Sequence, residues 1–76
     1  MEPPFKPTYI RAWRKERGMT MVELAEGSDV DQGQLSKLER GLLPYNQQNL
    51  ERIAKALGVT PAILIEIDPG KAGTSK

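Results

Sequence analysis

The 76-residue sequence contains neither cysteine nor histidine. The lack of cysteine excludes disulfide bonds and thiolate metal sites. The lack of histidine removes the commonest general base and the commonest metal ligand of proteins. Hydrolytic or metal-dependent chemistry would have to depend on carboxylates alone, and the sequence offers no paired arrangement of them. We therefore expect no catalytic residue, no metal site, no cofactor and no enzymatic activity.

Long apolar runs are also missing, since no stretch approaches the roughly 20 residues that a membrane-spanning helix needs. The first residues, from Met1 to Phe5, lack the charged start and apolar stretch of a secretory signal. We expect a cytoplasmic protein without a membrane partner. The formal net charge is only +1, so overall charge gives little attraction to nucleic acids.

The length allows one domain with a small core. Residues 1–7 hold three prolines and little to bury, which predicts an extended N-terminal arm. Residues 69–76 have the glycine-, serine- and lysine-containing composition of a flexible tail. The ordered domain is therefore predicted to cover residues 8–68.

Within this domain, five segments begin with a residue that commonly caps helices, and most of them end near a glycine. An apolar residue before the cap and another five positions later predict a hydrophobic staple in four of them. A strand is conceivable only over residues 63–67, where the preceding Thr60-Pro61 favours a helix. The predicted helices run from about Tyr9 to Arg17 after a Thr8 cap, from Thr20 to near Gly27, from Asp31 to Gly41, from Asn46 to Gly58, and from Thr60 onward.

The turn between the second and third predicted helices is short and has small residues on either side. Ala25 is small enough for the two helices to approach closely, and Asp29 tolerates the left-handed backbone that such turns often need. Val30 is predicted to anchor the turn in the core. Two short helices joined in this way can place one helix across DNA and the next in the major groove.

The sequence resembles the phage repressor/Cro-like helix-turn-helix family, also called the xenobiotic-response-element family, over residues 9–67. The resemblance implies an all-α, compact five-helix bundle of the lambda-repressor-like DNA-binding type. It also implies sequence-specific binding of double-stranded DNA by a transcriptional regulator, most simply a repressor. The matching residues are Arg14, Gly18, Thr20, Leu24, Ala25, Val30, Leu35, Ser36, Leu38, Glu39, Arg40, Gly41, Leu50, Ile53, Ala54, Ala56, Leu57, Gly58 and Val59.

By this resemblance, the third helix is the recognition helix, and it would present Gln32, Gly33, Gln34 and Lys37 to the bases and phosphates. Gln32 is the best candidate base reader, because a glutamine amide can pair with both N6 and N7 of adenine. Lys37 can reach either a guanine edge or a phosphate.

The resemblance also implies contacts with the sugar-phosphate backbone at the start of the second helix and after the third. The start of the second helix favours an anion through its unpaired amides and positive dipole end. Tyr45 has two interpretations. It could stack on a sugar, or it could only form the hydrophobic staple at the start of the fourth helix. Arg14 and Glu39 match family positions that form a structural ion pair. The backbone-contact candidates are Thr20, Met21, Arg40, Tyr45, Asn46 and Gln47.

Two residues depart from the family pattern. Met21 stands where the family usually carries a glutamine that bonds a phosphate, so that contact is lost or replaced. Gly33 removes a side chain from the reading face and weakens the third helix by up to about 1 kcal/mol relative to alanine. The glycine either lets the backbone approach DNA closely or is a substitution that the protein tolerates and that has no role in binding.

Charge is unevenly distributed, with a balance of +3 over residues 1–20 and −3 over residues 21–41. Because phosphate neutralisation supplies much of DNA affinity, we expect weak binding by a monomer and a homodimer that spans two half-sites. The alternative is a protein-interaction module of the same fold, such as an antitoxin or accessory domain. No sensor segment for a small-molecule effector is evident.

Apolar spacing gives expectations for the core and for a dimer contact. Ile10 and Trp13 are predicted to be core residues of the first helix. In the last helix, Ile63, Leu64 and Ile67 are predicted to share the inward face. The candidate dimer contacts are Ile65, which this helical phase turns outward, and Leu42 and Leu43 after the third helix.

Overall fold

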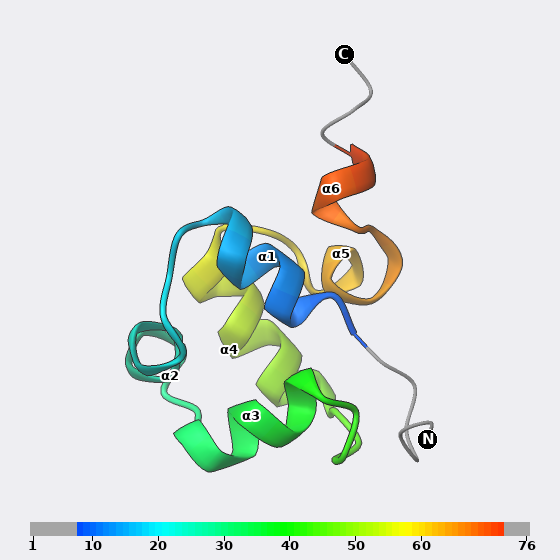
Figure 1. Cartoon of the computed structure of the whole chain (residues 1–76). Helices are drawn as coiled ribbons and strands as arrows, with labels where there is room; N and C mark the ends of the chain where they lie inside the picture. Colours follow the sequence, from blue (N-terminus) through cyan, green and yellow to red (C-terminus); the bar gives the residue numbers. More distant parts are fainter. Residues whose placement is uncertain (1–7, 73–76) are drawn as a thin grey trace.

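The computed structural model describes residues 8–72, which form helices and no strand (Figure 1). All five predicted helices are present, and none of those in the described part of the chain is long and apolar enough to cross a membrane. The predicted N-terminal arm, residues 1–7, lies outside the described residues, as do residues 73–76. The helices are α1 (Ile10–Glu16), α2 (Met21–Ser28), α3 (Gln32–Glu39), α4 (Gln47–Leu57), α5 (Pro61–Glu66) and α6 (Pro69–Ala72).

Side-chain caps fix the starts of α2, α3 and α4, as predicted. At α2, the Thr20 hydroxyl accepts a hydrogen bond from the Glu23 amide at 3.1 Å, and the Glu23 carboxylate accepts from the Thr20 amide at 2.8 Å. Asp31 and Asn46 cap α3 and α4 through the amide three residues later. Each cap provides an acceptor for an amide that has no partner within its helix, so these starts are determined locally.

Other helix boundaries differ from the prediction. Tyr9, rather than Thr8, occupies the N-cap position of α1 and makes no side-chain cap bond. Gly27, the predicted end of α2, lies inside the helix, which continues to Ser28. Thr60 occupies the N-cap position of α5, although its side chain makes no cap hydrogen bond.

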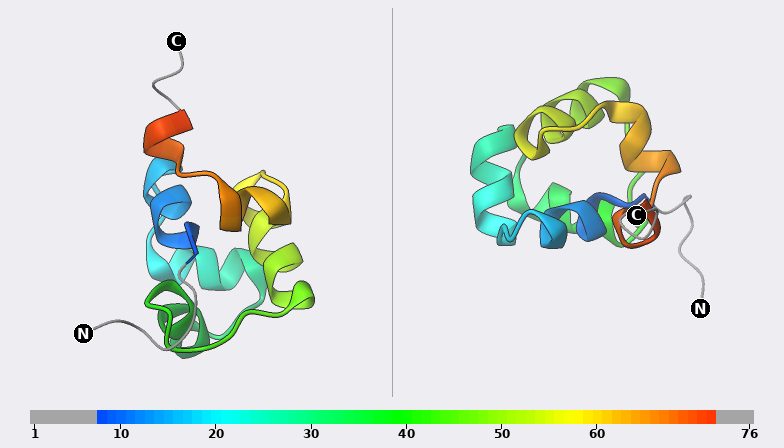
Figure 2. Two further views of the ribbon diagram at one scale, coloured as in Figure 1. Left: turned by 90° about the vertical axis from the view of Figure 1, so that its right-hand side faces the viewer. Right: turned by 90° about the horizontal axis from the view of Figure 1, so that it is seen from above.

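The core lies where α4 packs against α2 and α5, with α1 and α3 closing it (Figures 1 and 2). Burial of these apolar side chains at helical spacing is the main source of stability for such short helices. Each core residue exposes at most 4% of its surface. The buried apolar residues are Ile10, Leu24, Val30, Leu35, Leu38, Leu50, Ile53, Ala54, Leu57 and Leu64.

Part of the predicted flexible tail is helical, because α6 occupies residues 69–72 and packs beside α1 (Figure 2). The Trp13 indole donates a hydrogen bond to the Ile67 carbonyl at 2.9 Å, 54 residues away in the sequence. Pro69 is buried at the start of α6. Trp13, predicted as a core residue, is half-buried and packs against the core, and its ring centroid lies 5.4 Å from the Arg17 guanidinium carbon.

Candidate nucleic-acid interface

The turn that joins α2 to α3 has the predicted backbone. Asp29 adopts the left-handed conformation with φ of 60°, the only non-glycine residue among residues 8–72 with a positive φ. The Asp29 and Val30 amides both donate to the Ala25 carbonyl, which closes the end of α2. Val30 is 4% exposed and anchors the turn in the core. The turn therefore holds α3 at a fixed angle to α2.

The predicted reading residues all lie on the exposed face of α3. Leu35 and Leu38 are buried and attach the helix to the core. The first turn of α3 begins at Gln32 and is stabilised by the Asp31 cap. This arrangement leaves the first three residues of α3 exposed to solvent. The exposed residues are Gln32, Gly33, Gln34 and Lys37.

The two candidates for phosphate contact at the start of α2 differ in which of their polar groups already have a hydrogen-bond partner. Thr20 is exposed, but its hydroxyl already accepts the capping bond from Glu23. The Met21 side chain is half-buried and packs against the core. Because Met21 is the first residue of α2, its amide has no acceptor within the helix and remains suited to an anion.

The candidates after α3 also differ. Arg40 is exposed, whereas Tyr45 is half-buried and packs against the core, which favours its staple interpretation. Asn46 accepts the capping bond from Asn49 at 2.7 Å. Gln47 donates to the Glu51 carboxylate at 2.9 Å. Arg40 is therefore the member of this group whose side chain is least engaged.

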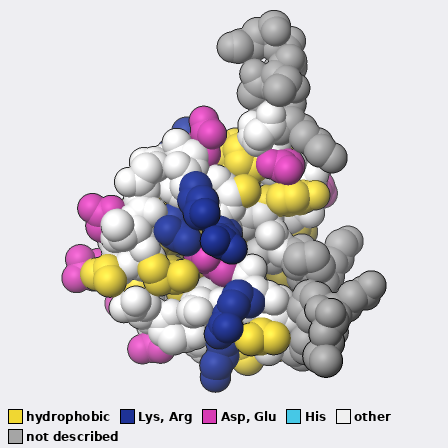
Figure 3. Space-filling model, viewed as in Figure 1, with side chains coloured by type: hydrophobic (Ala, Val, Ile, Leu, Met, Phe, Trp, Pro, Cys, Tyr) yellow, Lys and Arg dark blue, Asp and Glu magenta, His cyan; other side chains and the backbone are white. Residues whose placement is uncertain are grey.

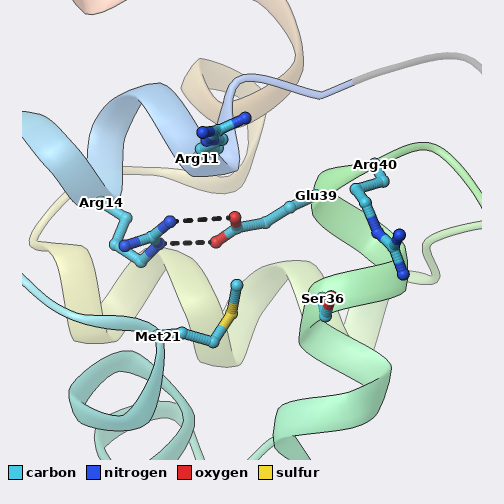
Figure 4. Close-up of a pocket in the computed structure, with 6 residues that line it drawn as sticks. All are labelled: Arg11, Arg14, Met21, Ser36, Glu39 and Arg40. Atoms are coloured by element: carbon cyan, nitrogen blue, oxygen red, sulfur yellow. Dashed lines mark hydrogen bonds and ion pairs between the residues drawn. The ribbon is translucent and has the colours of Figure 1, made fainter.

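Arg14 and Glu39 form a bidentate ion pair between α1 and α3 (Figure 4). Arg14 Nε and Nη2 donate to the two carboxylate oxygens at 2.8 and 3.2 Å, and Nη1 donates to the Met19 carbonyl at 3.0 Å. The side chains are only 12% and 2% exposed. A pair with this geometry and burial positions the end of α3 against α1.

A pocket of about 260 Å³ opens beside this ion pair, where α1, α2 and α3 meet (Figure 4). Arg11 and Ser36 line it, and neither was among the predicted site residues. In Figure 3, lysine and arginine side chains gather over α1 and α3 on this face. The other four lining residues were named from the sequence, and the +3 charge balance of residues 1–20 was the signal that included Arg11. The lining residues are Arg11, Arg14, Met21, Ser36, Glu39 and Arg40.

The candidate dimer contacts are placed unequally. Leu42 is 41% exposed, whereas Leu43 and Ile65 are half-buried and pack against the core. Ile67, predicted to point inward, is instead 39% exposed. The prediction for Ile67 was wrong because α5 ends at Glu66 and Ile67 adopts an extended conformation, whereas Leu64, also predicted to point inward, is fully buried.

Comparison with known proteins agrees with this geometry. Residues 10–64 match the family model described as helix-turn-helix. The chain belongs to the helix-turn-helix family. The resemblance to phage repressor/Cro-like proteins and the all-helical fold class are therefore confirmed.

Three similar proteins place this helix-turn-helix chain among regulators. It is 40% identical over 57 residues to an uncharacterized HTH-type transcriptional regulator of Mycobacterium tuberculosis, and 36% identical over 56 residues to the immunity repressor protein of Bacillus phage phi105. These matches cover 75% and 74% of this chain, but only 41% and 39% of the relatives. The crystal structure of the clp gene regulator ClgR from C. glutamicum is similar, with a TM-score of 0.70 and 39% identity over 74% of this chain and 72% of that one.

Proposed function

We propose that the chain binds double-stranded DNA sequence-specifically and regulates transcription as a repressor in the cytoplasm. The observation that carries this proposal is the exposed N-terminal half of α3, which the capped α2 and the Asp29 turn hold outward. The family and the named regulators among its relatives support the same function. An enzymatic role has no support from the family.

In this proposal α3 enters the major groove with its first turn foremost. Gln32 stands at the first position of α3, where a bidentate amide can read an adenine. Lys37 lies one and a half turns further along and binds a guanine edge or a phosphate. The start of α2 rests on the sugar-phosphate backbone, where the Met21 amide and the helix dipole attract a phosphate.

A homodimer is part of the proposal, because the net charge of +1 gives a single domain little electrostatic affinity for DNA. Two linked copies would contact two half-sites and gain affinity through effective concentration. Leu42, as the exposed member of the three candidates, is the best placed to contact a second copy. Sedimentation of the chain alone and with a duplex tests the proposed stoichiometry.

Binding to random-sequence duplex DNA across a salt series tests the proposal. A DNA-binding protein loses affinity linearly in the logarithm of salt concentration. Lys37→Ala should weaken binding to every duplex, whereas Lys55→Ala, which removes an exposed charge from α4, should not. Failure of the unmodified chain to bind any duplex at low salt would reject the proposal and favour the protein-interaction module.

A further inference from the structure

The pocket between α1, α2 and α3 carries an excess of positive charge. Three of its six lining residues are arginines, and its only acid, Glu39, is occupied by Arg14 through both carboxylate oxygens. Because the Glu39 side chain is 2% exposed, its charge is both neutralised and shielded from solvent. The pocket therefore presents the charge of the remaining two arginines, Arg11 and Arg40.

Arg11 and Arg40 are available to bind a ligand. Both are exposed, and within residues 8–70 neither takes part in an ion pair or a side-chain hydrogen bond. Figure 4 shows them on either side of Glu39, one from α1 and the other directly after α3. Two guanidinium groups at one opening suit an anion with several oxygens, such as a phosphate.

The position of the pocket relates it to DNA. Ser36, on its wall, lies four residues and about one helical turn after Gln32. Met21, on another wall, is the first residue of α2, whose amide has no acceptor in the helix. A backbone phosphate at the edge of the major groove that α3 enters would therefore lie at this pocket. The Met21 side chain on the apolar wall has neither a charge nor a hydrogen-bond donor. The arginines must therefore supply the positive charge that binds the phosphate.

We infer that Arg11 and Arg40 hold one DNA backbone phosphate between them, with the Ser36 hydroxyl as an additional donor. The inference rests on the proposed function and adds Arg11 and Ser36 to its binding residues. The charge of Arg14 is already paired with Glu39, and three of its five N–H groups donate to Glu39 and to the Met19 carbonyl, so Arg14 adds little net attraction for the phosphate. Arg14 instead keeps Glu39 from repelling the phosphate.

The test measures duplex affinity against salt concentration for the full chain and for Arg11→Ala, with Arg52→Ala as the control. Arg52 is an exposed arginine of α4 outside the pocket. Because Arg40 still contacts the phosphate, Arg11→Ala should lower the slope of log affinity against log salt by at most about 0.9, the value for one phosphate contact, and weaken binding by up to about tenfold near 50 mM salt, equally for all sequences. Arg52→Ala should leave both quantities unchanged.

Arg11→Lys separates charge from structure, because it keeps the charge and should retain most of the slope. An Arg11→Ala protein that binds with the slope of the unmodified chain overturns the inference, as does an Arg11→Lys protein that loses as much as Arg11→Ala. If the unmodified chain binds no duplex, the proposed function itself fails, which is a distinguishable result.

A second measurement separates a DNA phosphate from free phosphate. The arginine Nε–H NMR signals of Arg11 and Arg40 should shift when duplex DNA is added. Inorganic phosphate at the same ionic strength and at the same phosphate concentration should shift them far less, because it lacks the surrounding DNA contacts and binds more weakly. Saturation of both signals by inorganic phosphate alone would assign the pocket to the free anion instead.

Discussion

Arg14 and Glu39 illustrate how one buried contact serves both the fold and the proposed interface. The guanidinium is held by three hydrogen bonds, two to Glu39 and one to the Met19 carbonyl. Because both side chains are largely buried, loss of either partner leaves a charge that water solvates poorly. The pair therefore fixes α3 against α1 and neutralises the one acid that lines the pocket beside it.

A single substitution in this pair should destabilise the protein more than substitution of both residues together. Glu39→Leu alone should lower the free energy of unfolding by about 3 kcal/mol, because the Arg14 charge loses its partner. Combining it with Arg14→Met removes both charges, and the double variant should recover most of the loss. Urea unfolding measures both values, and a double variant as unstable as the two single variants combined would contradict the account.

At the residue scale, exposed binding groups are harder to predict than structural ones. The Arg14–Glu39 pair was expected from the family resemblance and is present in the structure. Arg11 was not predicted, because an exposed charge on a helix has no local pattern that separates a ligand contact from a solvated residue. Its proposed role depends on how α1, α2 and α3 meet in space.

At the scale of single elements, α2 and α3 each contain a glycine with a different environment. A Cβ added at Gly27 would lie 3.7 Å from the Ala56 Cβ, which is an ordinary van der Waals contact between α2 and α4. A Cβ added at Gly33 would lie 3.1 Å from Oδ2 of Asp31, the oxygen that caps α3. Alanine therefore fits the first site and strains the cap at the second.

We predict that Gly27→Ala raises the free energy of unfolding by about 1 kcal/mol, since alanine favours the helix and gains a contact. Gly33→Ala should raise the free energy of unfolding by clearly less, because the added Cβ forces the Asp31 carboxylate to move. Chemical denaturation of the two variants side by side measures the difference. An equal gain at both positions would show that the Asp31 cap does not limit substitution at Gly33.

Element boundaries were predictable where side chains act on neighbouring backbone. The capping box of Thr20 and Glu23 is encoded within four residues, and the start of α2 was predicted correctly. The end of α5 was not, because the helical phase was extended to Ile67 although Pro69, two residues later, is a common signal of a helix end. Helix α6 was missed for a similar reason, since its four residues are held by contacts with α1 rather than by their own propensity.

At the scale of the whole molecule, α1 joins the N-terminal and C-terminal parts of the described chain. Trp13 donates to the Ile67 carbonyl, and Arg17 donates to the Leu57 carbonyl at 2.8 Å. The Tyr9 amide also donates to the Leu64 carbonyl at 2.7 Å. These bonds hold the segment after α4 against α1, so they complete the domain around the core.

Trp13→Phe should lower the free energy of unfolding by about 1 kcal/mol, because a smaller aromatic ring takes the place of the indole and the hydrogen bond to Ile67 is lost. Amide hydrogen exchange in α6 should become faster in the same variant. Tyr9→Phe is the control, because the exposed Tyr9 hydroxyl makes no hydrogen bond within residues 8–70. Unchanged stability and exchange in Trp13→Phe would show that the indole bond does not hold α6.

The central claim is that the first turn of α3 reads DNA sequence through Gln32. The most direct measurement selects bound sites from a random duplex pool with the unmodified chain and again with Gln32→Ala. We predict that the second selection loses preference at one position of each half-site, where adenine is required by the glutamine amide, and keeps the preference elsewhere. An identical selected site for both proteins would contradict the claim.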